Sequence, residues 1–415
     1  MTSAAEDPNA LRLYEMARRA DWIGWLRAVS IRMAAVSRRL LPIALVACLS
    51  SAAPGAAQCT LPGLADPPRM PGIPFEELSQ RATEAWDAGR AEEAVRYFRA
   101  GVELNPLWHD GWWRLGLTLS DAGCHEAARD ALRRVVQLKP GAGPGWTLLG
   151  LSEYRLGSYD QAFADLTHGV TLGVAAAPEI GKQGLHALTL LLIRRGDFSA
   201  PSKNLAILVR IEADDSELVT ACGLMALRRP QLPSEVPAAD RTLVTAAGRA
   251  GCAAFAGQKD EARLRFQELV ARYPGTRGVH FAYGLLLSRE GSPEALPTLR
   301  REVELFPDNA EAHLEIAFDI LERGNPSEAL APARIAARLL PGSPWSRFAL
   351  GRALLATGSV GEAVAELERA SALGPEVRDV YVALAQAYSR AGRTADVERT
   401  RALLQRLDAA PGPGQ

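Results

Sequence analysis

Apolar residues recur along this chain with the spacing of paired amphipathic helices. Two stretches match each other at an offset of 34 residues, and the aligned pairs are Trp112 and Trp146, Leu115 and Leu149, Gly116 and Gly150, Gly123 and Gly157, Ala128 and Ala162, and Leu132 and Leu166. Within each stretch the apolar positions lie three or four residues apart, as they do on one face of an α-helix. The pattern therefore predicts a helix, a turn at the second glycine and a second helix.

A proline closes each copy of the pattern. These prolines are Pro106, Pro140, Pro274, Pro307, Pro341 and Pro375, and apart from one long gap they are 33 or 34 residues apart. Proline cannot continue a helix, so each one ends a second helix and starts the next copy. A period of this length is the mark of a repeat architecture, and the sequence predicts an all-α solenoid.

The repeated residues resemble the tetratricopeptide repeat. In that family the pattern runs W-x2-L-G-x2-Y on the first helix, followed by Ala and an aromatic residue on the second and then by Pro. The resemblance implies a right-handed superhelical solenoid of antiparallel helix pairs, with roughly nine hairpins and an irregular middle. It also implies a scaffold or adaptor that binds a protein or peptide partner in a concave groove, and no enzyme activity.

The repeats divide the chain into segments. We expect an extension or a mis-assigned start at 1–32, a signal peptide at 33–57, a Pro-rich strap at 58–74, repeats at 75–176, degenerate helical hairpins at 177–242, further repeats at 243–410 and a disordered tail at 411–415. Between 177 and 242 the aligned Trp, Ala and Pro are missing and the register slips. A Pro-rich loop at 229–237 interrupts this middle segment, which we expect to bend the solenoid. The last repeat has Val397 and Arg401 at usually apolar or small positions, which is typical of a capping repeat.

The N-terminal segment resembles a secretory signal. Arg38 and Arg39 precede an apolar run from 40 to 49, and small residues at 55–57 supply a cleavage site. These features predict an exported protein, periplasmic or secreted. Alternatively, the run Leu-Val-Ala-Cys ending at Cys48 resembles a lipobox, which would make Cys48 the lipidated N-terminus of an outer-membrane-associated lipoprotein acting in envelope assembly. An uncleaved anchor is disfavoured because prolines and serines interrupt the run.

Four cysteines remain after either cleavage: Cys59, Cys124, Cys222 and Cys252. An even number in an oxidising compartment suggests disulfides, and four cysteines allow three connectivities. Cys222 and Cys252 lie on successive predicted helices that can face each other, and Cys59 could pin the strap to Cys124. Four buried free thiols are the alternative.

Little else points to chemistry. The net charge is −1, with 47 basic and 48 acidic residues, which does not suggest nucleic-acid binding. Cys124, His125 and Glu126 lack the spacing of a metal site and are expected near the surface beside a turn. Phosphate-binding and hydrolase motifs are absent from the sequence, so we expect no cofactor. An enzyme site in the irregular middle segment is the remote alternative.

The first helices of the repeats are expected to line the groove. By register, the groove residues in the N-terminal repeats would be Trp86, Trp113, Tyr154 and Arg155, and those in the C-terminal repeats Phe318, Trp345, Phe348, Arg352 and Arg390. Exposed aromatic residues beside arginine are typical of a protein-binding surface. Aromatic residues at helical spacing also fill cores, which is the competing interpretation. The lysine and asparagine that clamp a terminal carboxylate in chaperone-binding relatives are not matched here.

Overall fold

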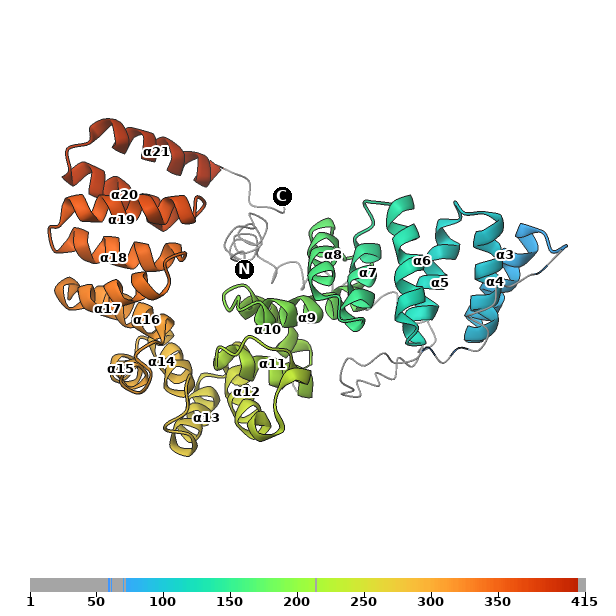
Figure 1. The fold of residues 1–415 in the computed structure, drawn as a ribbon, viewed down its shortest axis with the longest axis horizontal. Helices are drawn as coiled ribbons and strands as arrows, with labels where there is room; N and C mark the ends of the chain where they lie inside the picture. Colours follow the sequence, from blue (N-terminus) through green and yellow to red (C-terminus); the bar gives the residue numbers. More distant parts are fainter. Residues whose placement is uncertain (1–58, 60, 62–69, 71, 213–214, 410–415) are drawn as a thin grey trace.

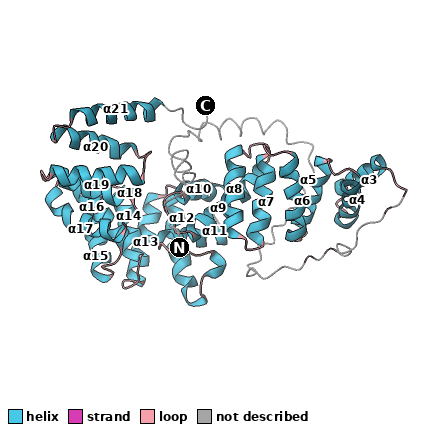
Figure 2. Ribbon diagram, turned by 45° about the horizontal axis from the view of Figure 1, so that its top comes forward, coloured by secondary structure: helices cyan, strands magenta, loops and turns pink. Residues whose placement is uncertain are grey.

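The computed structural model describes the chain except residues 1–58, 60, 62–69, 71, 213–214 and 410–415. The described residues form nineteen α-helices and two short 3-10 helices, without a strand. In Figure 1 the helices stack into two arms that meet at an angle. We call the segment where they meet, α9 to α13, the elbow. Figure 2 shows that most of the helices are joined by short loops, whereas a longer connection with two 3-10 helices joins α11 to α12.

The helices alternate in direction along the solenoid. Those of the N-terminal arm are α3 (Phe75–Asp87), α4 (Ala91–Leu104), α5 (His109–Asp121), α6 (His125–Leu138), α7 (Gly143–Arg155) and α8 (Tyr159–Leu172). The elbow contains α9 (Pro178–Arg194), α10 (Pro201–Ile211), α11 (Ser216–Ala226), η2 (Pro233–Glu235), η3 (Ala238–Asp240), α12 (Arg241–Phe255) and α13 (Lys259–Arg272). The C-terminal arm contains α14 (Val279–Arg289), α15 (Ala295–Leu305), α16 (Ala310–Glu322), α17 (Pro326–Leu339), α18 (Pro344–Ala356), α19 (Val360–Leu373), α20 (Arg378–Arg390) and α21 (Thr394–Ala409).

Small residues let the two helices of a hairpin approach each other. A Cβ added to Gly150 on α7 would lie 2.8 Å from the backbone nitrogen of Leu166 on α8. At Gly351 on α18 the added atom would lie 2.6 Å from Leu367 Cγ on α19. Both glycines have ordinary helical backbones, so their role is to leave space and not to adopt a special conformation. The small residue of the repeat pattern is therefore explained by close helix packing.

The repeat-ending prolines have a second role that the sequence pattern does not reveal. The Pro140 carbonyl accepts a hydrogen bond of 2.8 Å from Trp146 Nε1, six residues later. The same contact joins Trp112 Nε1 to the Pro106 carbonyl, His280 Nε2 to that of Pro274, and His313 Nε2 to that of Pro307, each at 2.9 Å. Because a carbonyl only accepts, the two histidines donate through a protonated Nε2. Each bond ties the loop between two repeats to the first turn of the next helix.

Replacing Trp146 by phenylalanine should lower the free energy of unfolding by about 1 kcal/mol, because this bond is lost while most of the ring packing remains. Urea unfolding followed by helical circular dichroism measures the change. Trp113 to phenylalanine is the matched control, since the Trp113 indole makes no hydrogen bond within the described residues. Equal losses in the two variants would show that the bond contributes nothing.

The elbow departs from the regular pairing of helices. Helices α3 to α10 form four hairpins and α12 to α21 form five, which leaves α11 as a single extra helix. As a result α12 packs against α11 on one side and against α13 on the other. A solenoid curves smoothly only when every unit repeats the same rotation, and an extra helix interrupts that regularity. We attribute the angle between the arms to α11.

The hydrophobic core runs along the molecule in successive clusters, as expected for a solenoid. The elbow has a continuous cluster that extends from Leu190 on α9 to Ala295 at the start of α15. Separate clusters fill the N-terminal arm and the C-terminal arm. The last helix, α21, buries Val397 and Thr400 but leaves most of its side chains exposed or half-buried.

Candidate partner-binding surface

The predicted groove residues of the N-terminal arm come from three first helices. Trp86 on α3 is half-buried, and the guanidinium of Arg114 lies 4.5 Å from the centre of its ring. Trp113 on α5 is also half-buried against the core of this arm. The Tyr154 ring lies 5.8 Å from that of Tyr159, and burial raises the pKa of the Tyr154 hydroxyl. Each aromatic ring is thus both part of the packing and partly open to solvent.

The two predicted arginines at the ends of first helices differ in their partners. Arg155, at the end of α7, is exposed. The pKa of His125 is lowered mainly by burial of its imidazole, and the positive charge of Arg155 lowers it further. Arg390, at the end of α20, is exposed but donates from Nη1 to the Leu355 carbonyl at 2.7 Å. This bond ties α20 to α18, so Arg390 is anchored at a defined place on the surface.

In the C-terminal arm, three aromatic side chains pack together. Phe348 on α18 has its ring centre 6.2 Å from that of Phe318 on α16 and 5.9 Å from that of Trp345. Phe318 and Trp345 are half-buried, whereas Phe348 is only 6% exposed. The expectation that Phe348 lines the groove is therefore corrected: neighbouring rings cover it. Arg352 covers the same ring from 5.5 Å and remains half-exposed.

Cys124 also lies deeper than expected. It is 2% exposed and bonded to Cys59, with the two Cα atoms 4.4 Å apart. His125 is half-buried, and its burial lowers the pKa of the imidazole. The expectation that these residues sit on the surface is corrected, because Cys59 is bonded to Cys124 beside the turn before α6 and both Cys124 and His125 are at least partly covered. Within the described residues, no three His, Cys, Asp or Glu side chains gather as they would around a metal ion.

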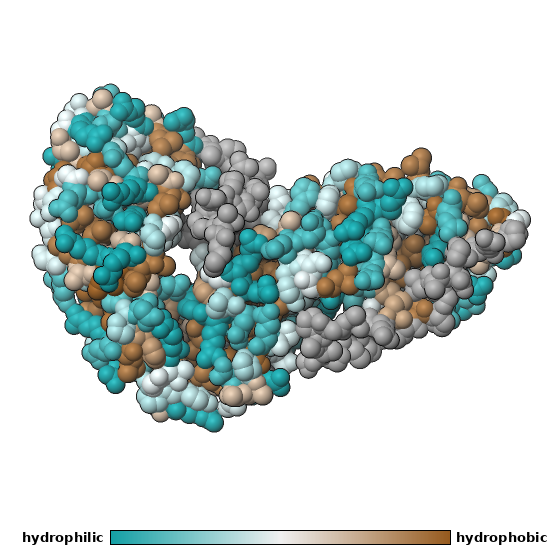
Figure 3. Space-filling model, viewed as in Figure 1, coloured by the Kyte–Doolittle hydropathy of each residue, from teal (hydrophilic) through white to brown (hydrophobic). Residues whose placement is uncertain are grey.

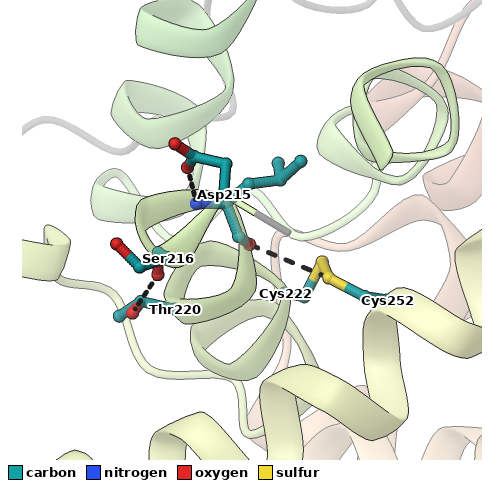
Figure 4. Close-up of a disulfide and its surroundings, with 6 residues drawn as sticks. Asp215, Ser216, Thr220, Cys222 and Cys252 are labelled. Carbon is teal, nitrogen blue, oxygen red and sulfur yellow. Dashed lines mark hydrogen bonds between the residues drawn. A yellow bond between two sulfur atoms is a disulfide. The ribbon is translucent and has the colours of Figure 1, made fainter. Parts of the chain in front are cut away.

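A second disulfide joins α11 to α12. Cys222 and Cys252 are bonded, with Cα atoms 5.6 Å apart, and Figure 4 shows the bond between the two helices. At the start of α11 the Asp215 carboxylate accepts a 2.7 Å hydrogen bond from the Leu218 backbone nitrogen, which caps the helix. Both bonded pairs are the ones that the sequence analysis put forward from the positions of the cysteines.

The backbones of α11 and α12 nearly touch beside this disulfide. A Cβ added to Gly223 would lie 2.0 Å from the Val244 carbonyl oxygen, and one added to Gly248 would lie 2.0 Å from that of Val219. Any larger side chain at either glycine would push the helices apart. The extra helix α11 is therefore fixed to α12 both by the disulfide and by close backbone packing at the two glycines.

Arg228, just after α11, connects the elbow to the C-terminal arm. Its Nη1 donates to the Phe198 carbonyl at 3.1 Å, and its Nε lies 2.7 Å from Glu311 Oε2 on α16. The guanidinium also lies 5.1 Å from the ring centre of Phe198 and 5.4 Å from that of Phe281 on α14. Its backbone is left-handed, with φ of 54°, which is uncommon for a residue other than glycine. This conformation directs the chain out of α11 into the Pro-rich loop.

A pocket opens between α11, α12 and α14 at the elbow. It is a shallow hollow that is continuous with solvent, and its apolar walls include Met225, Ala226, Phe255, Ala282, Leu285 and Leu286. Arg228 and Arg289 supply its polar groups. Of its two arginines only Arg228 lies in the segment 177–242, where an enzyme site was the remote alternative, and no acidic or histidine side chain is among the described residues that line the walls. Sequence reasoning missed this pocket because it depends on where α11 packs.

The third hairpin holds two buried carboxyl groups that face each other. Glu153 on α7 is 1% exposed and Asp165 on α8 is 5% exposed. Burial, followed by the contact with Asp165, raises the pKa of the Glu153 carboxyl to about 7. Gln161 Nε2 donates to Asp165 at 3.2 Å, and Arg133 reaches Glu153 Oε1 at only 3.4 Å. Glu153 stands where the family pattern has tyrosine, which is the signal by which the sequence could have revealed it.

Figure 3 shows apolar and polar patches alternating along both arms on the described part of the face in view. Among the described residues, no helix combines the length and the apolar character that crossing a bilayer requires. Many charged side chains of the two arms form ion pairs at the surface, as in the pair of Arg378 with Asp408 at 2.8 Å. These pairs contribute little to stability.

Comparison with known proteins identifies the class. Models of the tetratricopeptide repeat match residues 79–143, 285–344, 344–387 and 249–276. The chain belongs to the tetratricopeptide-repeat family and is a scaffold for protein–protein interaction with a protein partner. The matched ranges leave out residues 144–248, which include most of the elbow. No curated protein sequence matches the chain.

Several solved structures resemble the fold. Yeast Tom70 is 11% identical, with 80% of this chain and 84% of that chain covered and a TM-score of 0.33. A tetratricopeptide repeat protein from Parabacteroides merdae is 14% identical, with 75% and 98% covered and a TM-score of 0.30. The tetratricopeptide domain of P58(IPK) is 14% identical, with 77% and 99% covered and a TM-score of 0.27. We take neither a partner nor an activity from these likenesses.

Proposed function

We propose that the chain is an exported scaffold that holds a protein partner along the face formed by the first helices of its repeats. The observation that carries export is the pair of disulfides, Cys59–Cys124 and Cys222–Cys252. Disulfides persist in the periplasm and outside the cell and are rare in the reducing cytosol. The basic and apolar residues at 33–57 support the same compartment.

Export is tested by fusing N-terminal segments to alkaline phosphatase, which is active only after it forms its own disulfides. Fusions that carry residues 1–74 or 33–74 should be active in cells, and a fusion that carries only residues 58–74 should be inactive. Equal activity of all three fusions would contradict export through this segment. Activity of the second fusion alone would place the natural start at Met33.

The partner-binding face is supported by half-buried aromatic residues on first helices of both arms. Trp113 on α5 and Trp345 on α18 combine partial exposure with firm packing, which suits residues that anchor a partner. A photo-crosslinking amino acid placed at 113 or at 345 should capture the same partner in cells. Placed at Arg338, an exposed position on the second helix α17, it should not. Capture of that partner with equal yield from all three positions would contradict the proposed face.

The alternative is a lipoprotein acting in envelope assembly. The observation that favours it is the Leu-Val-Ala-Cys run ending at Cys48, which lies outside the described residues. Lipidation would make Cys48 the first residue of the mature chain and would anchor it to a membrane. Intact-mass measurement separates the two, because the lipoprotein would carry acyl chains on Cys48 and the exported form would begin near Gln58.

A further inference from the structure

The two disulfides of the chain differ in their access to solvent. Cys59 is exposed, although its partner Cys124 is only 2% exposed. In the other pair, Cys222 is 0% exposed and Cys252 is 7% exposed. Thiol–disulfide exchange begins when a thiolate reaches one sulfur of a disulfide, so burial of both cysteines slows it. An attacking thiol can therefore reach the first disulfide from the Cys59 side, whereas the second disulfide is shielded at both cysteines.

The second disulfide is also supported by the packing of the helices that carry it. Helices α11 and α12 approach each other closely at Gly223, next to Cys222, and at Gly248, about one turn before Cys252. These backbone contacts would keep the two thiols close together after reduction. A thiol that is held at high effective concentration beside another favours re-formation of the bond. This pair is therefore placed to stay oxidised.

Cys59 has less support of this kind. It lies outside any helix, and Cys59 and Leu61 are the only described residues before Met70. Leu61 is half-buried against the core of the N-terminal arm, whereas Cys124 is fixed at the start of α6. After reduction, the Cys59 thiol would therefore have a lower effective concentration at Cys124 than the two helix-borne thiols have at each other.

We propose that Cys59–Cys124 is a reversible redox site that a thioredoxin-like dithiol protein reduces, while Cys222–Cys252 remains oxidised as a structural bond. The attacking thiolate forms a bond to Cys59 Sγ. The Cys59–Cys124 bond breaks, and its electron pair leaves on Cys124 Sγ, which takes up a proton. The second thiol of the dithiol then attacks the mixed disulfide and releases Cys59 as a thiol. Two electrons and two protons thus pass to the chain, and the dithiol becomes a disulfide.

Reduction changes where the chain is attached to the solenoid. In the oxidised chain Cys59 is fastened beside the turn before α6. In the reduced chain the attachment would begin at Phe75, the first residue of α3, whose ring centre lies 5.2 Å from that of Trp108. Residues 59–74 would then act as a tether that spans at most about 50 Å when extended. This redox control of the N-terminal attachment goes beyond the proposed scaffold function.

The first test measures how easily each disulfide is reduced in the folded chain. The full exported chain is equilibrated in buffers with different ratios of reduced to oxidised dithiothreitol, and the thiols formed are alkylated and located by peptide mass mapping. Cys59–Cys124 should be half-reduced at a ratio at least about tenfold lower than Cys222–Cys252 requires. Helical circular dichroism should be unchanged when only the first pair is reduced. Equal ratios, earlier reduction of Cys222–Cys252, or loss of helix with the first pair would each overturn the proposal.

The second test identifies the sulfur that is attacked. A thioredoxin variant that keeps only its attacking cysteine cannot resolve the mixed disulfide, so it stays bonded to its target. Added to the native chain, it should be captured on Cys59, as peptide mapping of the adduct reports. Capture on Cys124, Cys222 or Cys252 would contradict the proposal, as would the absence of any capture.

A double variant, Cys59→Ser with Cys124→Ser, is the control for both tests. It should keep the helical circular dichroism of the native chain and should capture no thioredoxin. Unfolding of this variant would show that the bond is structural, and capture equal to that of the native chain would show that another cysteine reacts. Either result would make the proposal wrong. Crosslinking from positions 113 and 345 in the oxidised chain reports the scaffold function separately.

Discussion

Replacing Glu302 by alanine is expected to lower the free energy of unfolding by about 3–5 kcal/mol, among the largest losses for any single substitution in the chain. Glu302 on α15 is fully buried. Its Oε1 accepts from the Gly278 nitrogen at 2.8 Å and from Asn309 Nδ2 at 2.9 Å, and its Oε2 accepts from the Phe281 nitrogen at 3.2 Å. Two of these donors belong to the unpaired first turn of α14, where a negative charge is favourable.

The size of the effect follows from what remains after the carboxylate is removed. Alanine leaves three donors without an acceptor and leaves an empty space beside them, and each buried unsatisfied donor costs about 1–3 kcal/mol. Chemical unfolding at pH 7 measures the loss. Glu304→Ala on the same helix is the control, because Glu304 is exposed and pairs only with Arg301. Its effect should stay within about 0.5 kcal/mol. Similar results for the two variants would show that Glu302 does not cap α14.

Stability is expected to fall by about 2–3 kcal/mol between about pH 4.5 and pH 7 through Glu153 alone. The pKa of its carboxyl is raised to about 7 in the folded chain from an ordinary value of 4.5. Between these values the folded state holds a proton that the unfolded state has lost, so raising the pH favours unfolding. Below about pH 4.5 both states are protonated, and above about pH 7 both are ionised.

The reason lies in the donors around Glu153. Glu302 is held by three donors, whereas Glu153 faces the carboxyl of Asp165, and its Oε2 has no hydrogen-bond partner among the described residues. Two ionised carboxylates in a buried site repel each other, and a proton on one of them supplies the missing donor. Glu302 is therefore a stabilising cap, whereas Glu153 stabilises the fold only when it is protonated.

Glu153→Gln is the test of this account. The amide supplies a donor to Asp165 at every pH, so the variant should be more stable than the native chain by about 2–3 kcal/mol at pH 8 and equally stable at pH 4. Asp160→Asn is the control, because Asp160 is fully exposed and its one ion pair, with Arg195, is long at 3.5 Å. A difference between Glu153→Gln and the native chain that does not change with pH would contradict a shared proton.

Much of the fold could be predicted from the sequence because repeat periodicity is a local signal. The offset of 34 residues, the small residues at Gly150 and Gly351 and the closing prolines predicted antiparallel helix pairs, and the family match confirms the class. Exposure of single side chains could not be predicted in the same way. Phe348 lies at a groove position by register, yet Phe318, Trp345 and Arg352 cover it.

The role of two histidines could likewise not be predicted from the sequence. His280 and His313 looked dispersed in the sequence, whereas in the structure each replaces tryptophan as the donor to a proline carbonyl. Indole and imidazole rings each carry an N–H that can donate to this carbonyl, but the two residues are otherwise different. A comparison of residue types along the sequence therefore does not detect that they are equivalent here. The structure therefore assigns these histidines to the repeat framework.

The sequence by itself determined the helices, the repeat length and the family, because these depend on periodic apolar positions and on prolines that act within a few residues. It also put forward, among three possible connectivities, the cysteine pairs that the structure joins. The sequence also predicted a bend in the irregular middle segment, but only the tertiary structure revealed the extra helix α11, the pocket and the facing carboxyls Glu153 and Asp165. These features arise where α11 breaks the repeat or where two helices meet, and contacts between distant residues leave no periodic pattern in the chain.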